Sequence, residues 1–219
     1  MGAGGWTHHL QSIFSRVFPR WISDPCETAW RTSPWPYPML TFDDVDEGCI
    51  RRILAILEPA GIQAVFFVVG RDVERRLDLL SAITAAGHII GNHSYSHRDM
   101  RALKLEDAQK EIAKTQEIIS EYGGPRWFRP PYGAISKELR EWLHQEGYTI
   151  VLWSLDAGDW RKRATVESVV AAAGQATDRD IVLMHARPVA VDALPKILER
   201  WNERNLLPSV AVTAEGNRA

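Results

Sequence analysis

From residue 38 onward the chain alternates between short apolar runs and longer stretches in which apolar and polar residues repeat at helical spacing. The short runs are typical of buried strands, and several of them are closed by glycine or a polar residue. The amphipathic stretches are typical of helices, and several end at a glycine that can terminate the last turn. This pattern predicts a strand that ends at Phe42, further strands over 64–69, 88–91, 127–128, 149–155, 180–184 and 207–212, and helices over 50–57, 73–86, 105–122, 136–146, 166–175 and 192–201.

Single strands that alternate with helices indicate a parallel sheet, because parallel neighbours need a long crossover connection. Seven strands and six intervening helices suggest that the sheet closes into a barrel, although a doubly wound open sheet fits the same pattern. At 219 residues the chain has a length that suits one α/β domain. We therefore predict a barrel over residues 38–213 and a flexible tail over 214–219.

Residues 1–37 are predicted to form an N-terminal extension. Apolar residues recur there at helical spacing with Arg16 and Arg20 between them, which indicates a short amphipathic helix. We expect this helix to lie against the barrel or a partner subunit, and a membrane surface is the alternative. The extension lacks the apolar core and cleavage site of a secretory signal, so we expect a cytoplasmic or membrane-peripheral protein. Its apolar positions are Leu10, Ile13, Phe14, Val17, Phe18 and Trp21.

The composition narrows the possible partners. Lys and Arg total 26 against 28 for Asp and Glu, and no long basic run occurs, so nucleic-acid binding is disfavoured on electrostatic grounds. No run of about 18 apolar residues is present, which argues against a membrane-spanning helix. Cys26 and Cys49 fit no CxxC pattern and leave their redox state open, and the oligomeric state is open as well.

Residues able to carry chemistry follow three of the predicted strands. His93 and His97 lie four positions apart, and on a helical turn both imidazoles would face one centre. Asp43 and Asp44 end the first strand, and His185 ends another. Because catalytic groups in barrels collect at the carboxyl ends of strands, these residues predict one shared site. Two imidazoles need a third protein ligand to hold an ion such as Zn²⁺ with a position left open for water.

Five short motifs resemble those of a known family. They are Thr-Phe-Asp-Asp at 41–44, His-Ser-Tyr-Ser-His at 93–97, Arg-Pro-Pro-Tyr at 129–132, Asp-Ala-Gly-Asp-Trp at 156–160 and Leu-Met-His at 183–185. In this order they resemble the polysaccharide deacetylases of carbohydrate esterase family 4, which share the NodB homology domain. The resemblance implies a distorted (β/α)7 barrel and a hydrolase that uses a divalent metal to remove N-acetyl or O-acetyl groups from a polysaccharide or oligosaccharide.

The resemblance also implies roles for the residues at the centre of the site. Asp44, His93 and His97 match the metal ligands. The ion is expected to be Zn²⁺, with Co²⁺, Mn²⁺ or Ni²⁺ as possible substitutes, because these ligands are not selective. Asp43 matches the general base, and His185 matches the general acid, a role suited to a side chain that titrates near neutral pH.

The remaining motif residues are expected to support these groups. Arg129 matches the arginine that pairs with the base carboxylate. Asp159 is the carboxylate expected to orient His185, with Asp156 as the alternative. The backbone N–H of Tyr132 would stabilise the oxyanion. The walls of the pocket for the acetyl group would be built by Trp160, Leu183, Pro131 and Tyr132.

Two other functions remain possible from the sequence. A metal-dependent amidohydrolase of the same fold could act on a non-sugar amide, because residues 45–48 depart from the Gly-Pro that most family members have there. A catalytically silent carbohydrate-binding barrel is the second alternative. Retention of Asp43, Arg129 and His185 argues against it, because binding alone needs neither a base nor an acid. The motifs do not identify the sugar.

Overall fold

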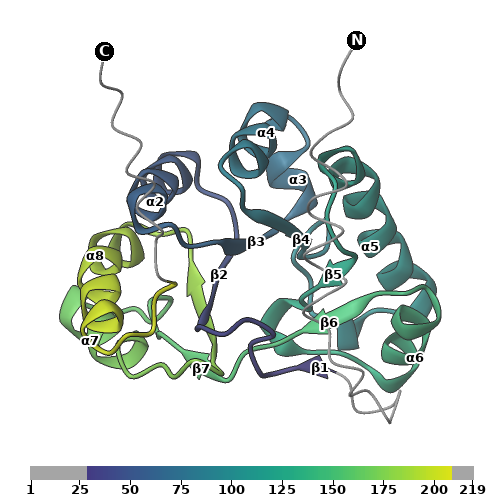
Figure 1. Ribbon diagram of the computed structural model, residues 1–219. Helices are drawn as coiled ribbons and strands as arrows, with labels where there is room; N and C mark the ends of the chain where they lie inside the picture. The colour runs from purple at the N-terminus through teal and green to yellow at the C-terminus, as the bar shows by residue number, and fades with distance from the viewer. Residues whose placement is uncertain (1–28, 209–219) are drawn as a thin grey trace.

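Eight strands of this protein form one parallel sheet that curls into a barrel with its helices on the outside, as the computed structural model in Figure 1 shows. The structure describes residues 29–208. Neighbouring strands follow the order β1-β6-β5-β4-β3-β2-β8-β7, and each of these pairs is parallel. The strands are β1 (Ala29–Trp30), β2 (Met39–Asp43), β3 (Ala64–Val68), β4 (Ile89–Asn92), β5 (Trp127–Phe128), β6 (Thr149–Val151), β7 (Leu155–Asp156) and β8 (Ile181–His185).

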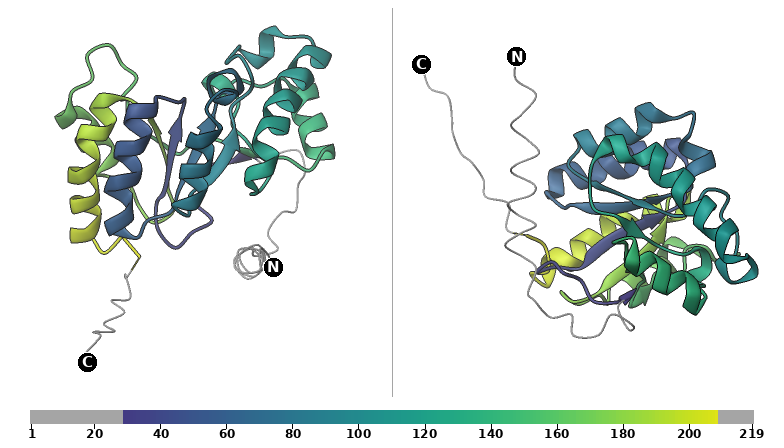
Figure 2. Two further views of the ribbon diagram at one scale, coloured as in Figure 1. Left: turned by 90° about the horizontal axis from the view of Figure 1, so that it is seen from above. Right: turned by 90° about the vertical axis from the view of Figure 1, so that its right-hand side faces the viewer.

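The helices connect these strands and cover the outer face of the sheet. Helices α2 and α8 lie side by side on one flank next to α7, while α5 and α6 cover the opposite flank (Figures 1 and 2). Ser136 caps α6 as predicted, because its hydroxyl accepts a hydrogen bond from the Leu139 N–H. The elements are α2 (Glu47–Ala60), α3 (Gly70–Val73), α4 (Leu77–Ala85), α5 (Leu105–Ile119), α6 (Lys137–Gln145), α7 (Val166–Ala173) and α8 (Pro188–Glu203), with 3₁₀ turns η1 (Met100–Ala102), η2 (Ser120–Tyr122) and η3 (Pro131–Gly133).

The barrel is distorted where the chain runs between β6 and β7. We predicted one strand over 149–155, but β6 pairs with β1 and β5 while β7 pairs with β8 at the other edge of the sheet. At this crossing, the carbonyls of Val151, the last residue of β6, and of Leu152 accept hydrogen bonds from the Arg129 guanidinium. The prediction of a single strand over 149–155 was therefore wrong. The distorted parallel barrel itself is confirmed.

Other predicted elements differ from the structure or lie beyond what it describes. The helix predicted over 73–86 begins only at Leu77, as α4, because Val73 is the last residue of the separate helix α3 and a turn at residues 74–76 lies between them. Leu207 and Pro208 are not in a strand, and the rest of the strand predicted over 207–212 lies outside the described residues. The N-terminal amphipathic helix and the tail over 214–219 also lie outside them.

The limits of the N-terminal extension remain a prediction, although β1 shows that residues 29–30 already pair with the sheet. Within residues 29–208, no helix combines the length and the apolar character that crossing a membrane requires.

Alternation along β2 explains why polar side chains reach the barrel interior. Leu40 and Phe42 belong to the apolar layer between sheet and helices, whereas Met39 belongs to the cluster inside the barrel. Because successive side chains on a strand point to opposite faces, Thr41 and Asp43 also point inward. The inward face is therefore apolar at the start of the strand and polar at its carboxyl end.

His88 is a buried residue whose protonation opposes folding. Its Nδ1 accepts a hydrogen bond from the Ala64 N–H at 3.2 Å, and burial lowers its pKa from 6.5 to about 4. Between these pH values the unfolded chain binds a proton that the folded chain does not. The stability that neutral His88 contributes is thus present above pH 6.5 and is lost as the pH falls towards 4, by about 3 kcal/mol in all.

His88→Asn should remove much of this pH dependence, because the amide oxygen can accept from the Ala64 N–H and does not titrate. Between about pH 7 and about pH 4.5, the unfolding free energy of the variant should fall by about 2 kcal/mol less than that of the wild type. Denaturant unfolding at the two pH values measures both losses. Equal losses in the two proteins would contradict the role assigned to His88.

Candidate active site

Unusual backbone conformations mark the carboxyl end of the barrel. Among the described residues, five that are not glycine have positive φ, and four of these lie in the motifs identified from the sequence. A left-handed conformation costs a residue other than glycine of the order of 1–3 kcal/mol, so it persists only where surrounding contacts enforce it. The four residues are Asp44, Ser94, His97 and Tyr132, with φ of 64°, 63°, 58° and 60°.

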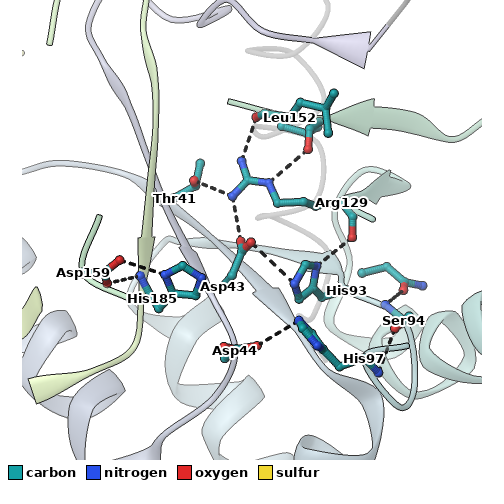
Figure 3. Close-up of polar contacts among 12 residues, drawn as sticks. Thr41, Asp43, Asp44, His93, Ser94, His97, Arg129, Leu152, Asp159 and His185 are labelled. Carbon is teal, nitrogen blue, oxygen red and sulfur yellow. Dashed lines mark hydrogen bonds and ion pairs between the residues drawn. The ribbon is translucent and has the colours of Figure 1, made fainter. Parts of the chain in front are cut away.

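Asp43 and Arg129 form a buried ion pair at the centre of the site (Figure 3). The Arg129 Nη1 lies 2.7 Å from Asp43 Oδ1 and 2.7 Å from the Thr41 hydroxyl oxygen. Its other nitrogens donate to the carbonyls of Val151 and Leu152. Burial lowers the pKa of Arg129 and the Asp43 charge opposes that shift, so the cation needs this partner.

Asp44, His93 and His97 converge beside this pair and form the group able to hold a metal ion within the described residues. One ligand atom from each residue lies within 4.8 Å of the other two. Two ligand atoms on opposite sides of an ion with bonds of about 2.0–2.2 Å would lie at a similar distance from each other. The Nδ1 of His93 lies 2.7 Å from the Arg129 carbonyl oxygen. Because a carbonyl only accepts, Nδ1 must carry the proton, and Nε2 keeps its lone pair for an ion.

Burial lowers the pKa of His93, and the charges of Asp43 and Asp44 oppose part of this shift. The imidazole is therefore neutral, which is the form that binds metal. Two imidazoles with one carboxylate match the donor set of catalytic zinc sites. The residues present fit a divalent ion.

The segment from His93 to His97 is not the helical turn that we expected. Residues 93–97 form an irregular bend in which Ser94 and His97 are left-handed. The Ser94 hydroxyl accepts from the His97 N–H, and the Ser94 N–H donates to Asn92 Oδ1. These local bonds replace the helical ones and turn the two imidazoles towards each other, with ring centroids 5.0 Å apart. The two imidazoles do face one centre, as predicted, but a bend brings them together and not the helical turn that we expected.

His185 and Asp159 form a second pair across the site from the histidine bend. His185 is the register partner of Asp43 on the neighbouring strand β8. Asp159 accepts from the His185 backbone N–H at 2.7 Å and lies 2.9 Å from its Nδ1. Asp156 instead accepts from the Trp160 indole and the Gly158 N–H. Of the two carboxylates considered from the sequence, Asp159 is thus the one that contacts His185.

The environment of His185 favours its protonated form. Burial lowers the pKa of His185, but the hydrogen bond and charge of Asp159 and the charges of Asp43 and Asp44 raise it by more. The net shift of the pKa is therefore upward.

If the protonated ring acts in turnover, kcat/KM falls as the pH rises through this raised pKa. Asp159→Asn removes the main stabilising charge, so the basic limb of the pH profile should move to lower pH. Asp156→Asn, the matched control, should leave the basic limb in place, and equal profiles for both variants would contradict the role of Asp159.

The residues expected to build the acetyl pocket differ in exposure. Leu183 lies on β8 and Pro131 lies in η3, and both side chains are buried. Tyr132 is 68% exposed and packs edge-on against His97 at 4.9 Å between centroids. Trp160 is 50% exposed, and its indole N–H is held by Asp156. Exposed aromatic rings beside a few buried polar groups are typical of a ligand-binding surface.

Two supporting residues were not singled out from the sequence. Thr41 accepts from Arg129 and donates to the Val182 carbonyl, and its place two positions before Asp43 on one strand face could have indicated this. Glu111 on α5 bonds the histidine bend through Tyr95 and Ser96. No sequence signal separated Glu111 from the other acids of an amphipathic helix.

Comparisons with known proteins agree with this arrangement. A family model described as polysaccharide deacetylase matches residues 31–151. A peptidoglycan-N-acetylglucosamine deacetylase of Bacillus cereus is 31% identical, over an alignment that covers 80% of this chain and 68% of that protein. Other curated relatives are longer, and the chain spans 36% of one and 31% of another.

Two solved structures illustrate the range of similar proteins. A family 4 carbohydrate esterase from Streptomyces lividans, in complex with acetate, has a TM-score of 0.74 and 32% identity, with 80% of this chain and 92% of that chain covered. A CE4 family pseudoenzyme from Bacillus anthracis has a TM-score of 0.72 and 28% identity, with 79% and 63% covered. Similarity of fold alone therefore does not decide activity.

Proposed function

The chain belongs to the polysaccharide deacetylase family, and we propose that it hydrolyses N-acetyl groups of a peptidoglycan-type glycan with a divalent metal bound by Asp44, His93 and His97. The observation that carries this proposal is that the metal-binding group lies beside two complete ion pairs, Asp43 with Arg129 and His185 with Asp159. The substrate class is taken from the relatives, whose names refer to peptidoglycan. O-acetyl groups are the secondary possibility.

Each charged residue has a separate task in the proposed reaction. When bound, a divalent ion polarises the amide carbonyl and lowers the pKa of a coordinated water towards about 7. Asp43, fixed by Arg129, accepts the proton of the attacking water. His185, which Asp159 keeps protonated, donates a proton to the departing sugar nitrogen.

The other motif residues orient the acetyl group. The backbone N–H of Tyr132 donates to the oxygen of the reacting carbonyl, and its left-handed conformation turns the peptide unit for that purpose. Leu183, Pro131 and Trp160 enclose the methyl group. Zn²⁺ is the proposed ion because its preferred ligands are nitrogen and carboxylate oxygen, with Co²⁺, Mn²⁺ and Ni²⁺ as substitutes.

The two alternatives from the sequence make different demands on the site. A catalytically silent barrel has no use for a buried arginine that holds a base, yet Arg129 is fully buried and bonded to Asp43. A buried ion pair of this kind is costly to maintain in a protein that only binds. The non-sugar amidohydrolase would keep the same site and differ in its surrounding loops, so substrate tests must separate it.

Acetate release tests the proposed function. The purified protein is incubated with N-acetylglucosamine oligosaccharides, with peptidoglycan and with an aryl acetamide, before and after chelation and after Zn²⁺ is restored. We expect release from the glycans that stops with the chelator and returns with the ion. Release from the aryl acetamide alone would favour the non-sugar amidohydrolase, and no release from any substrate would favour the silent barrel.

Metal content tests the ligand assignment. Asp44→Gly is the sharpest variant, because glycine accepts the left-handed backbone at φ 64° and supplies no ligand. Elemental analysis should find less than one equivalent of metal in Asp44→Gly and in His93→Ala. His144→Ala is the matched control, because His144 is exposed on α6 and lies outside the motifs. If both ligand variants keep a full equivalent, the assignment is wrong.

A further inference from the structure

Glu111 is bonded to the bend that carries the two histidines. The residue lies on α5, where its Oε2 accepts hydrogen bonds from the backbone N–H groups of Tyr95 at 3.1 Å and Ser96 at 2.7 Å. Its Oε1 accepts from the Ser96 hydroxyl at 2.7 Å. One half-buried carboxylate thus satisfies three donors located between His93 and His97.

The bend needs support from outside because its own conformation is unfavourable. Ser94 and His97 are left-handed, and each such residue costs of the order of 1–3 kcal/mol. The N–H groups of Gly70 and Arg71 at the start of α3 bind the carbonyls of Ser94 and Tyr95, so these bonds hold the acceptor side of the bend. Glu111 holds the donor side.

The charge of Glu111 makes its bonds stronger than those of a neutral acceptor. Hydrogen bonds to an ionised group are about twice as strong as bonds between neutral groups. Loss of the carboxylate would leave two backbone N–H groups without this acceptor and would free the bend to relax. His97 would then have to be ordered again when an ion binds, and that cost would appear as weaker metal binding.

We propose that Glu111 is a positioning residue that preforms the metal site by fixing the bend from His93 to His97. The inference rests on the proposed function, because it takes these histidines to be ligands. Glu111 itself is not one of the converging residues. Its effect is exerted through the backbone of Tyr95 and Ser96.

Metal affinity in three variants tests the proposal, with Zn²⁺ titrated against a chromophoric chelator. Glu111→Ala should weaken Zn²⁺ binding by about 10–100-fold, the usual effect of removing a group that orients a ligand. Glu111→Gln should rescue most of the loss, because its amide oxygen accepts from the backbone and its NH₂ donates to the Ser96 hydroxyl. Glu117→Ala is the control on the same helix, since Glu117 is exposed and its carboxylate has no bonded partner within residues 29–208.

The thermal stability of the metal-free proteins separates positioning from simple support of the fold. The proposal would be overturned if the Glu111→Ala protein were less stable than the wild type but bound Zn²⁺ equally well. Equal losses of affinity in Glu111→Ala and Glu117→Ala would also overturn it. If Glu111→Ala does not fold, Ser96→Ala removes one of the three bonds and should still weaken Zn²⁺ binding beyond the control.

Failure of the proposed function gives a different result. A wild-type protein that binds no Zn²⁺, Co²⁺, Mn²⁺ or Ni²⁺ would refute the metal site and this inference together. Tight binding by the wild type, with no change in Glu111→Ala, would refute the inference alone. At saturating Zn²⁺, kcat of the Glu111→Ala protein should approach that of the wild type, because Glu111 does not touch the reacting atoms.

Discussion

Asp43→Asn should abolish most hydrolysis while the protein keeps its fold and its metal. The amide oxygen can still accept from Arg129, so the shape of the site is preserved while the proton acceptor and its negative charge are removed. Loss of a general base typically lowers turnover by about 10²–10⁴-fold. The measurement is kcat/KM on an N-acetylglucosamine oligosaccharide, with metal content determined on the same preparation.

Asp46→Asn is the matched control for this substitution. Asp46 lies three positions further along the chain, and its carboxylate caps α2 by accepting from the Cys49 N–H. Asparagine caps a helix about as well as aspartate, so turnover should stay close to that of the wild type. A metal-loaded Asp43→Asn protein with normal turnover would show that another group accepts the proton.

Arg129→Met should give the largest loss of stability, about 3–5 kcal/mol in unfolding free energy, together with loss of activity. The substitution removes four hydrogen bonds and leaves the Asp43 carboxylate buried without a partner. It also removes the cation that packs 4.2 Å from the Phe67 ring centroid. Denaturant unfolding measures the loss.

Two companion variants isolate the buried charge as the cause. Arg126→Met removes an exposed arginine that makes one backbone hydrogen bond, so it should cost less than about 1 kcal/mol. The double variant Asp43→Asn/Arg129→Met should be more stable than Arg129→Met, because the unpaired charge is gone. Strict additivity of the two single changes would contradict this explanation.

Strand ends were predictable from the sequence because polar residues interrupt long apolar runs there. The predicted end of the first strand, Phe42, lies one residue before the end of β2, and the run at 181–184 lies within β8. Parallel topology then places the ends together, so Asp43 and His185 could be expected at one site. The strand over 149–155 was not predictable in detail, since its division depends on a side chain, Arg129, from a distant motif.

Within the site, residue types were easier to predict than backbone geometry. The spacing of His93 and His97 fits a helix, but a bend with two left-handed residues brings them together equally well. That bend is stabilised by Glu111 and by the start of α3, which are contacts between segments distant in sequence. Local pattern carries no information about such contacts, so Glu111 looked like a surface residue of an amphipathic helix.

The register between β2 and β8 has a consequence for how this protein can change over evolutionary time. Asp43 and His185 lie side by side as register partners on adjacent strands, and neighbouring strands are about 4.7–4.9 Å apart. Main-chain hydrogen bonds therefore set the spacing between the two residues proposed to transfer protons, whereas Tyr132 and Trp160 stand on connections beyond the strands. A lineage could replace those connections and acquire a new sugar while inheriting the reactive pair unaltered, and a protein engineer could graft loops onto this barrel for the same reason.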